Sequence, residues 1–354
     1  MAISTDSQRA MPRRHARLLF ALPLLAVLLT AGMAITATTA SRATAVPIAG
    51  AGRLYHDATP NEGWLAPVGT PPPRVATAAS IIGEDERIPI PDTTIFPFSA
   101  IAYLELFNDK NELFAVCSGT FIGPDALLTA GHCLWDSGRG TWNARRIRVI
   151  PAKEHDFEPF GSAYATDWWV PEGFLDTGGS VDFDWGIVRL PDDRLTLDTS
   201  WLPVAVLTTA SLRDPAFTPA IVGYPVDKPP QTMWGQSRRA FDAVEAYRLY
   251  YDIDTSGGQS GSAIWSLKPG STLGYVVGIH TQGSGGTGYN SGSRIDRELL
   301  DDLRAACAVM GCTIDAVIEG ESATPPPTPT ATAQPTVPPG PRPYRASVPA
   351  LARD

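Results

Sequence analysis

The stretch Asp254-Thr-Ser-Gly-Gly-Gln-Ser-Gly-Ser262 places one serine, Ser260, inside a glycine-rich turn. Such a turn lets several backbone N–H groups point at one spot, and Gly258 has the conformational freedom that this arrangement needs. A serine hydroxyl is a weak nucleophile by itself. The turn therefore predicts chemistry only if a base and an orienting acid lie elsewhere in the chain.

A histidine and an aspartate that could activate Ser260 both precede it in the sequence. His132 follows a run of small residues, and Asp184 lies in Asp182-Phe-Asp-Trp-Gly-Ile-Val-Arg-Leu190. The three residues follow one another at spacings of 52 and 76 residues. The order His, Asp, Ser is one of the known chain orders of the Ser-His-Asp triad. The pattern therefore predicts nucleophilic catalysis by Ser260.

These motifs resemble the signatures of chymotrypsin-fold serine proteases, and they match the bacterial glutamyl-endopeptidase branch best. The resemblance covers about residues 80–306 and rests on Thr129-Ala-Gly-His-Cys133 and Gly257-Gly-Gln-Ser-Gly-Ser262. Three further stretches share it: Ser80-Ile-Ile-Gly-Glu-Asp-Glu-Arg87, Ser118-Gly-Thr-Phe-Ile122 and Gly278-Ile-His-Thr-Gln-Gly283. It implies an all-β fold of two antiparallel six-stranded barrels with a C-terminal helix, and a site in the cleft between the barrels.

The resemblance also implies a role for each residue of the site. His132 takes the proton of Ser260, Asp184 orients the imidazole, and the N–H groups of Gly258 and Ser260 form the oxyanion hole. Asp182 is the rival acid, two residues away. Asp184 is preferred because the run Asp-Trp-Gly-Ile-Val-Arg matches the pattern of the family.

The residues expected around the substrate pocket point to two different specificities. His280 and Thr255 match the positions at which the glutamyl endopeptidases bind the substrate carboxylate, and Thr281 begins a strand that would pair with the substrate backbone. Asp254, six residues before Ser260, instead suggests a pocket for Arg or Lys. Pointing inward, it would repel a Glu side chain, and pointing to solvent, it would not. The prediction is cleavage after Glu, then Asp, with trypsin-like or another specificity on the same fold as the alternative.

The residue directly before the serine, Gln259, bears on activation. Trypsin relatives that are activated from zymogens carry an Asp there, which pairs with a new N-terminal ammonium group. A neutral glutamine cannot form that salt bridge with Ile81-Ile82-Gly83. The sequence therefore departs from trypsin and agrees with the glutamyl-endopeptidase branch.

The two ends of the chain differ in composition from the middle. Residues 1–45 combine arginines, an apolar run and small residues, which predicts a secretory signal peptide rather than a signal anchor. Residues 46–79 are interpreted as a pro-segment and 80–322 as the protease domain, with Ser80 or the next residue as the mature N-terminus. Residues 323–354 predict a Pro/Thr-rich disordered tail, which could also associate with the cell surface.

The chain contains four cysteines, an even number that is consistent with disulfide formation after export. Cys117 and Cys133 are 16 residues apart, and Cys307 and Cys312 would close a small loop after the helix. Zinc is the competing interpretation, but no CxxC pair with a nearby His supports it. Two disulfides are predicted.

Charge and composition limit the partners. The chain carries a formal net charge of −9, which becomes about −15 over 80–322 and disfavours nucleic acid and anionic membranes. No cofactor and no metal cluster is predicted, although the acidic loops leave room for a structural calcium ion. The partners expected are polypeptide substrates of a secreted monomer, and a non-catalytic peptide-binding module is the alternative.

Recurrent short apolar runs bounded by turn residues predict strands rather than alternating strands and helices. The predicted strands cover 100–107, 114–122, 147–151, 186–190, 220–223, 247–252 and 275–280. One helix is predicted at 296–309, with an apolar stripe on one face.

Overall fold

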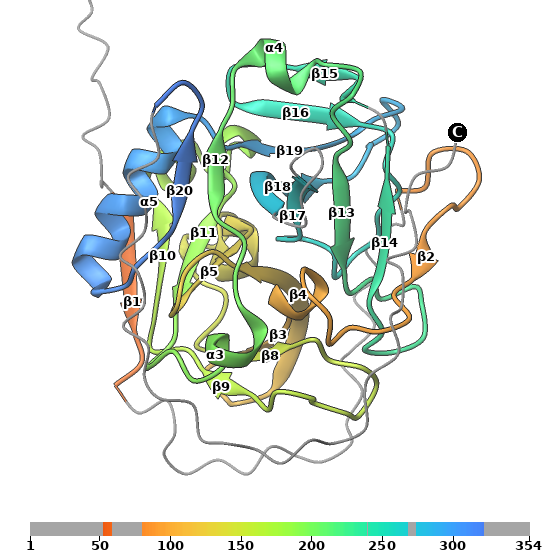
Figure 1. Cartoon of the computed structure of the whole chain (residues 1–354). Coiled ribbons are helices and arrows are strands. Elements are labelled where there is room, and N and C mark those ends of the chain that lie inside the picture. Colours follow the sequence, from red (N-terminus) through yellow and green to blue (C-terminus); the bar gives the residue numbers. More distant parts are fainter. Residues whose placement is uncertain (1–51, 59–79, 239, 268–273, 322–354) are drawn as a thin grey trace, which may run out of the picture. The chain divides into compact units, whose positions relative to one another are not determined.

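Short strands rich in β-branched and aromatic residues assemble into two large sheets (Figure 1). The computed structural model describes residues 52–58, 80–238, 240–267 and 274–321. The predicted signal peptide and Pro/Thr-rich tail lie outside these residues. Within the described ranges, no helix is long and apolar enough to cross a membrane.

The first sheet contains eight antiparallel strands in the order β1-β10-β11-β5-β4-β3-β8-β9. Its strands are β1 (Gly52–His56), β3 (Ile101–Phe107), β4 (Leu113–Phe121), β5 (Ala126–Thr129), β8 (Arg146–Pro151), β9 (Ala163–Tyr164), β10 (Asp167–Pro171) and β11 (Gly186–Arg189). Strand β3 is buried along its whole length, so this sheet wraps its own apolar core.

The second sheet contains ten strands: eight in the order β15-β16-β19-β18-β17-β13-β14-β2, then β12 beside β18 and β20 beside β12. Its strands are β2 (Ile88–Pro89), β12 (Val204–Val206), β13 (Ala220–Gly223), β14 (Trp234–Ser237), β15 (Ala243–Val244), β16 (Arg248–Tyr251), β17 (Ala263–Leu267), β18 (Gly274–Gln282), β19 (Asn290–Arg294) and β20 (Ala316–Ile318). Strand β12 pairs with β18 and β20 in parallel. A small hairpin joins β6 (Trp135–Asp136) and β7 (Thr141–Trp142).

Helix α5 (Arg297–Met310) confirms the predicted C-terminal helix. Asp296 caps its first turn by accepting a hydrogen bond from the Leu299 N–H at 2.8 Å. Gly311 ends it in the left-handed conformation, which glycine adopts without a steric cost. The remaining helical segments are short: η1 (Phe98–Ala100), α1 (Gly131–Leu134), α2 (Glu172–Asp176), η2 (Val181–Phe183), α3 (Thr196–Thr199) and α4 (Thr209–Leu212).

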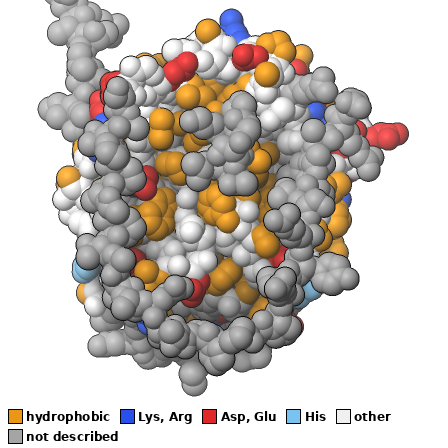
Figure 2. Space-filling view, in the orientation of Figure 1, with side chains coloured by type: hydrophobic (Ala, Val, Ile, Leu, Met, Phe, Trp, Pro, Cys, Tyr) orange, Lys and Arg blue, Asp and Glu red, His pale blue; other side chains and the backbone are white. Residues whose placement is uncertain are grey.

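The all-β class is confirmed, and each predicted strand overlaps a strand of the structure. The described pairings run as open orders of eight and ten strands, so closure into two six-stranded barrels is not confirmed. One apolar cluster contains buried residues from β3, β13 and α5 and thereby joins the two sheets. On the face shown in Figure 2, the Lys and Arg side chains are scattered among neutral and apolar ones rather than gathered into a patch.

Candidate active site

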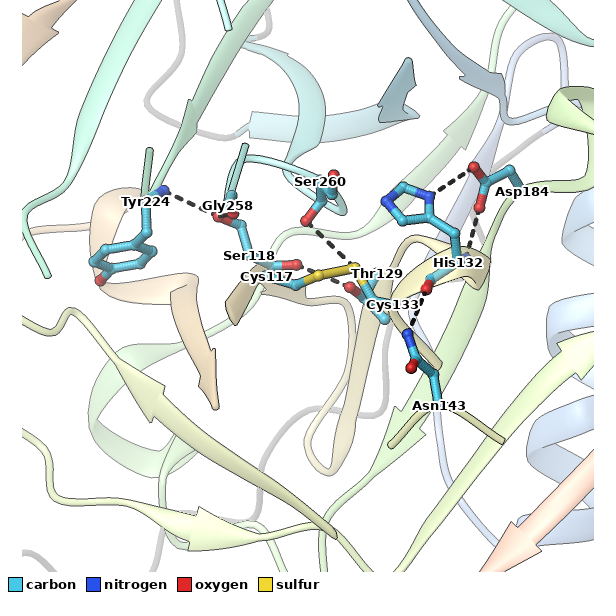
Figure 3. Close-up of a disulfide and its surroundings, with 10 residues drawn as sticks. All are labelled: Cys117, Ser118, Thr129, His132, Cys133, Asn143, Asp184, Tyr224, Gly258 and Ser260. Atoms are coloured by element: carbon cyan, nitrogen blue, oxygen red, sulfur yellow. Dashed lines mark hydrogen bonds and ion pairs between the residues drawn. A yellow bond between two sulfur atoms is a disulfide. The ribbon is translucent and has the colours of Figure 1, made fainter. Parts of the chain in front are cut away.

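His132 and Asp184 meet because strands β5 and β11 are neighbours. Thr129 at the end of β5 lies opposite Gly186 at the start of β11, so α1 and the residues before β11 leave the sheet side by side. The His132 Nδ1 lies 2.8 Å from Asp184 Oδ2, and Asp184 Oδ1 accepts the backbone N–H of His132 at 2.9 Å (Figure 3). Asp184 is 1% exposed, so its carboxylate is dedicated to this histidine.

The rival acid does not reach the imidazole. Asp182 lies in the short helix η2, where its N–H donates to the hydroxyl of Ser180. Burial by itself lowers the pKa of His132, but the charge of Asp184 and its hydrogen bond outweigh burial and raise the pKa above its ordinary value. The ring is therefore easier to protonate than a free histidine, as a base that must take up a proton requires.

The turn that carries Ser260 has a backbone that only glycine adopts easily at position 258. Gly258 has φ +89°, and a Cβ built there would lie 2.3 Å from the carbonyl oxygen of Tyr224. Among the hydrogen bonds of the described residues, the N–H groups of Gly258 and Ser260 donate none. Both amides are therefore available for an oxygen atom of a substrate.

Ser118, on β4, fixes this turn from the first sheet. Its N–H donates to the Ser260 carbonyl at 2.9 Å, and its hydroxyl donates to the Gly258 carbonyl at 2.9 Å. The same hydroxyl accepts the N–H of Tyr224 at 3.0 Å (Figure 3). The sequence motif around Ser118 marks the family resemblance but gives no hint of this role, which depends on contacts over 140 residues.

Both predicted disulfides are present, Cys117–Cys133 and Cys307–Cys312. The first joins β4 to α1, and so connects the strand of Ser118 with the helical turn of His132. The second ties the C-terminal end of α5 to the residue after Gly311. The described residues contain no free cysteine.

Ser260 and His132 face one pocket of about 240 Å³. Its walls are Ser80, His132, Thr255, Ser256, Gly257, Ser260, His280, Thr281, Gln282 and Gly283. The structure gives no hydrogen bond between the Ser260 hydroxyl and the imidazole; in unliganded sites such bonds are often long and tighten when substrate binds. A second pocket of about 270 Å³ shares His132 and Gln282 and extends past Trp135. The predicted catalytic and substrate-binding residues therefore line these two pockets: His132, Asp184, Ser260, Thr255, His280 and Thr281. Gly258 lies in the turn that carries Ser260 and lines neither pocket.

His280 is a buried, neutral imidazole. Its Nδ1 lies 2.7 Å from the hydroxyl of Tyr251, and burial, with the nearby His132 and Arg248, lowers the pKa of His280 to about 3. Burial also raises the pKa of Tyr251 well above its ordinary value, so the phenol keeps its proton and can donate a hydrogen bond to Nδ1. In the tautomer that accepts this hydrogen bond, the ring proton of His280 lies on Nε2, which makes Nε2 a hydrogen-bond donor.

Asp254 adopts neither orientation considered from the sequence. It is fully buried, not solvent-facing, and it is absent from the pocket wall. Its Oδ1 accepts the N–H of Ile82 at 2.7 Å and its Oδ2 accepts the N–H of Glu86 at 3.0 Å. Burial raises the pKa of Asp254, and the two amides act in the opposite direction. The carboxylate therefore holds the segment that follows Ser80.

Gln259 has an unforeseen partner in that same segment. Its Oε1 accepts hydrogen bonds from the Arg87 guanidinium at 3.2 Å and from the Ser256 N–H at 3.0 Å. The Arg87 side chain is fully buried and also forms ion pairs with Asp85 and Asp227. The segment after Ser80 thus reaches the residue before the candidate nucleophile through a side chain rather than through an N-terminal ammonium group.

Known proteins resemble this chain in sequence and in fold. A family profile described as a trypsin-like peptidase domain matches residues 117–279. A glutamyl endopeptidase from Bacillus licheniformis is 33% identical over 228 residues, which cover 63% of this chain and 68% of that protein. A protein named extracellular metalloprotease from Bacillus subtilis is 30% identical over 231 residues, which cover 64% and 69%.

A solved structure supports the same relationship. The structure titled Glu endopeptidase in complex with MPD has a TM-score of 0.56 and 26% identity, over 64% of this chain and 99% of that chain. Within the described ranges, no group of three or more His, Cys, Asp or Glu side chains could hold a metal ion. The chain therefore belongs to the trypsin-like serine peptidases, in the branch that contains the glutamyl endopeptidases.

Proposed function

We propose that this protein is a secreted serine endopeptidase that cleaves peptide bonds after Glu, and less readily after Asp. One observation supports the proposal most directly. The same pocket is lined by Ser260, by His132 with its buried partner Asp184, and by the two hydrogen-bonding side chains His280 and Thr255. A nucleophile, its base and a recognition site for a carboxylate thus lie within reach of one bound residue.

In the proposed reaction, the Ser260 hydroxyl attacks the peptide carbonyl while His132 Nε2 takes its proton. Asp184, already bonded to Nδ1, keeps the ring in the required tautomer and stabilises the imidazolium. The negative oxygen of the tetrahedral intermediate is bound by the amides of Gly258 and Ser260. His132 then gives its proton to the leaving amine, and the acyl group stays on Ser260. Water, which loses a proton to His132, attacks this acyl group, and the Ser260 oxygen leaves and regains its proton from His132.

The preference for Glu follows from the groups available in the pocket. His280 Nε2–H and the Thr255 hydroxyl can each donate to a carboxylate oxygen, whereas an incoming guanidinium would find no carboxylate among the residues that line the pocket. Asp254, the group that would attract a cation, is already bonded to two backbone amides outside the pocket. The pocket therefore lacks the carboxylate that trypsin-like specificity would need.

Ser80 adds a further feature if the chain is cut just before it. Its N–H donates to the Thr255 carbonyl at 2.8 Å, and Ser80 itself lines the pocket. A free α-amine at this position would bring a positive charge beside the carboxylate of the substrate. Secretion would follow from the predicted signal peptide at 1–45, and processing from removal of 46–79.

The substrate backbone would bind along the end of β18. Strand β17 stops pairing at Ala263, opposite Ile279, and the His280 N–H donates to the Ser262 carbonyl. Beyond this point the described pairing of β18 is with β19 alone. The edge at Thr281 and Gln282 can therefore accept an extended peptide as an added strand.

A panel of otherwise identical peptide substrates, varied only at the residue before the scissile bond, tests the proposal. We expect the highest kcat/KM for Glu, then Asp, and little turnover for Gln, Arg or Lys. Ser260→Ala removes turnover without unfolding the protein, and an organophosphonate probe labels the parent but not this variant. Best turnover after Arg or Lys would overturn the Glu preference, and absence of labelling in processed protein would favour a non-catalytic peptide-binding module.

The role of His280 needs a separate variant. His280→Ala should lower kcat/KM for Glu substrates by roughly 10²–10³-fold, because a carboxylate would lose a desolvated hydrogen-bond donor. Hydrolysis of the same peptide with Ala before the scissile bond serves as the matched control and should change far less. An equal loss on both substrates would show that His280 only supports the fold.

A further inference from the structure

Strand β1 (Gly52–His56) lies in the segment that precedes the protease domain, yet it is an ordinary strand of the first sheet. All five residues pair antiparallel with β10, from Gly52 opposite Pro171 to His56 opposite Asp167. The N–H of Asp57 extends the ladder by donating to the Thr166 carbonyl at 2.8 Å. In Figure 1, β1 forms the outer edge of this sheet.

The contact is made by side chains as well as by the backbone. The Tyr55 ring stacks on Trp168 with centroids 4.3 Å apart and an interplanar angle of 14°. It also meets Trp142 edge-on at 5.7 Å, and the Arg145 guanidinium lies 5.8 Å from its centroid. Trp168 is fully buried in the intact chain. Tyr55 therefore sits in an aromatic pocket formed by the protease domain alone.

Two contacts between acidic and basic side chains lie beside this aromatic contact, at the C-terminal end of β1. His56 Nδ1 lies 2.7 Å from Asp167 Oδ1, and the Asp167 side chain is only 7% exposed. Asp57 pairs with Arg146 at 3.5 Å, and both of these side chains are about nine-tenths buried. Without β1, the edge of β10 would present unpaired backbone groups next to a partly desolvated carboxylate and an exposed Trp168. Such an edge is energetically unfavourable and prone to pair with another strand.

We propose that the outer edge of β10, with Trp168, Trp142 and Asp167, is a docking surface whose occupant is the pro-segment strand 52–57. The strand stays bound as a separate polypeptide after the chain is cut between 58 and 80. The processed protease is then a complex of two chains cut from one precursor, not a free domain. The proposal rests on the proposed function only in that processing supplies the cut.

The test uses the chain from residue 46 onward with Ser260→Ala, so that it cannot digest itself. A recognition sequence for a sequence-specific viral protease is inserted after Pro67, and the folded protein is cut there. We expect the short fragment to co-elute with the remainder on size exclusion, and to appear with it in native mass spectra at a one-to-one ratio. A fragment that elutes alone from folded, cut protein overturns the proposal.

Two substitutions within β1 distinguish specific docking of the strand from nonspecific association. Tyr55→Ala should speed release of the cut fragment by roughly 10- to 100-fold, because it removes a partly buried ring that stacks on Trp168. Leu54→Ala is the matched control: Leu54 is 37% exposed on the other face of the strand, so release should change less than about threefold. Equal release rates for the two variants would contradict the docking surface.

A third measurement does not require any variant of β1 to fold within the protein. A labelled synthetic peptide of residues 50–59 should exchange into the cut parent protein and displace the native fragment, while a peptide with Tyr55→Ala should not. Because an external protease makes the cut and Ser260 is absent, these results do not depend on catalysis or on the natural processing site. Failure of the protease proposal and failure of this one are therefore distinguishable.

Discussion

Asp254 stands directly before Thr255 in the chain, yet its carboxylate serves the backbone rather than the pocket. Two N–H groups, from Ile82 and Glu86, converge on its two oxygens, and its own N–H donates to Gln236 Oε1 at 2.6 Å. A buried carboxylate is stable only when its lone pairs are satisfied, and here they are satisfied by a neighbouring segment. The same residue type thus has a structural use here where trypsin relatives use it for specificity.

The first prediction concerns this carboxylate. Asp254→Asn keeps the shape but replaces one acceptor by an NH₂ group that faces a backbone N–H, so the free energy of unfolding should fall by about 1–3 kcal/mol. Denaturant unfolding measures this loss, and the half-exposed neighbour Asp252→Asn is the control. The ranking of substrates should still place Glu above Arg. A large drop in any residual cleavage after Arg would instead show that Asp254 faces the pocket.

The second prediction follows from the lowered pKa of His280. An unfolded histidine titrates near pH 6.5, whereas burial holds this pKa at about 3 in the folded protein. Between these values the unfolded state binds a proton that the folded state does not. The contribution of His280 to the free energy of unfolding is therefore fully present above about pH 6.5 and is lost as the pH falls towards the folded-state pKa. In this range His280 makes the free energy of unfolding change by up to about 1.4 kcal/mol per pH unit. His280→Ala should remove that slope in chemical denaturation series, and an unchanged slope would contradict the assignment.

At the scale of elements, the site depends on how strands β4, β5 and β11 present their ends. The pairing of β5 with β11 brings His132 to Asp184, and β4 carries both Cys117 and Ser118. Ser118 is the only residue of this strand described as bonded to two carbonyls of the Ser260 turn. The turn of Ser260, the proposed nucleophile, is therefore aligned by an element of the other sheet.

The third prediction tests that alignment. Ser118→Ala removes the hydroxyl that bridges the Gly258 carbonyl and the Tyr224 N–H, and leaves both without a partner. We expect kcat to fall by about 10- to 100-fold with KM little changed, because the oxyanion donors lose their alignment. Thr120→Ala, a buried hydroxyl two residues along the same strand, is the control and should keep its kcat. A KM effect alone would indicate a distorted pocket instead.

The elements that were predictable from sequence are those with a strong local pattern. Strands such as β3 and β18, and helix α5 with its Asp296 cap, follow from apolar periodicity and turn residues. Strand β1 was missed because its apolar face is essentially one tyrosine, and Trp168, which completes it, lies more than a hundred residues away. Tertiary contact, not local preference, makes this segment a strand.

The candidate site also combines residues that a sequence pattern predicts with residues that only tertiary contacts bring into place. The residue types and order of His132, Asp184 and Ser260 predict the chemistry without a structure. Their supports could not be found in this way, because Tyr251 beside His280 and Arg87 beside Gln259 carry no motif. Such partners are set by which strands lie next to each other, and the linear sequence does not display that.

For the molecule as a whole, two disulfides make unequal contributions to stability. The Cys117–Cys133 loop spans 16 residues and Cys307–Cys312 spans 5, so loop-closure entropy gives stabilisations of about 3 and about 2 kcal/mol. The fourth prediction is that the paired alanine variant at 117 and 133 loses both stability and activity, whereas the variant at 307 and 312 loses stability alone. Thermal unfolding and kcat, measured in parallel, decide this. Equal activity losses would contradict it.

The position of the first disulfide also has a consequence for the cell that makes the protein. In a reducing cytosol the two thiols stay unbonded, so the helical turn of His132 is not joined to the strand that aligns the Ser260 turn. Oxidation after the proposed export supplies that join. A newly made chain would therefore be least able to digest the proteins of its producer during the interval in which it is still surrounded by them.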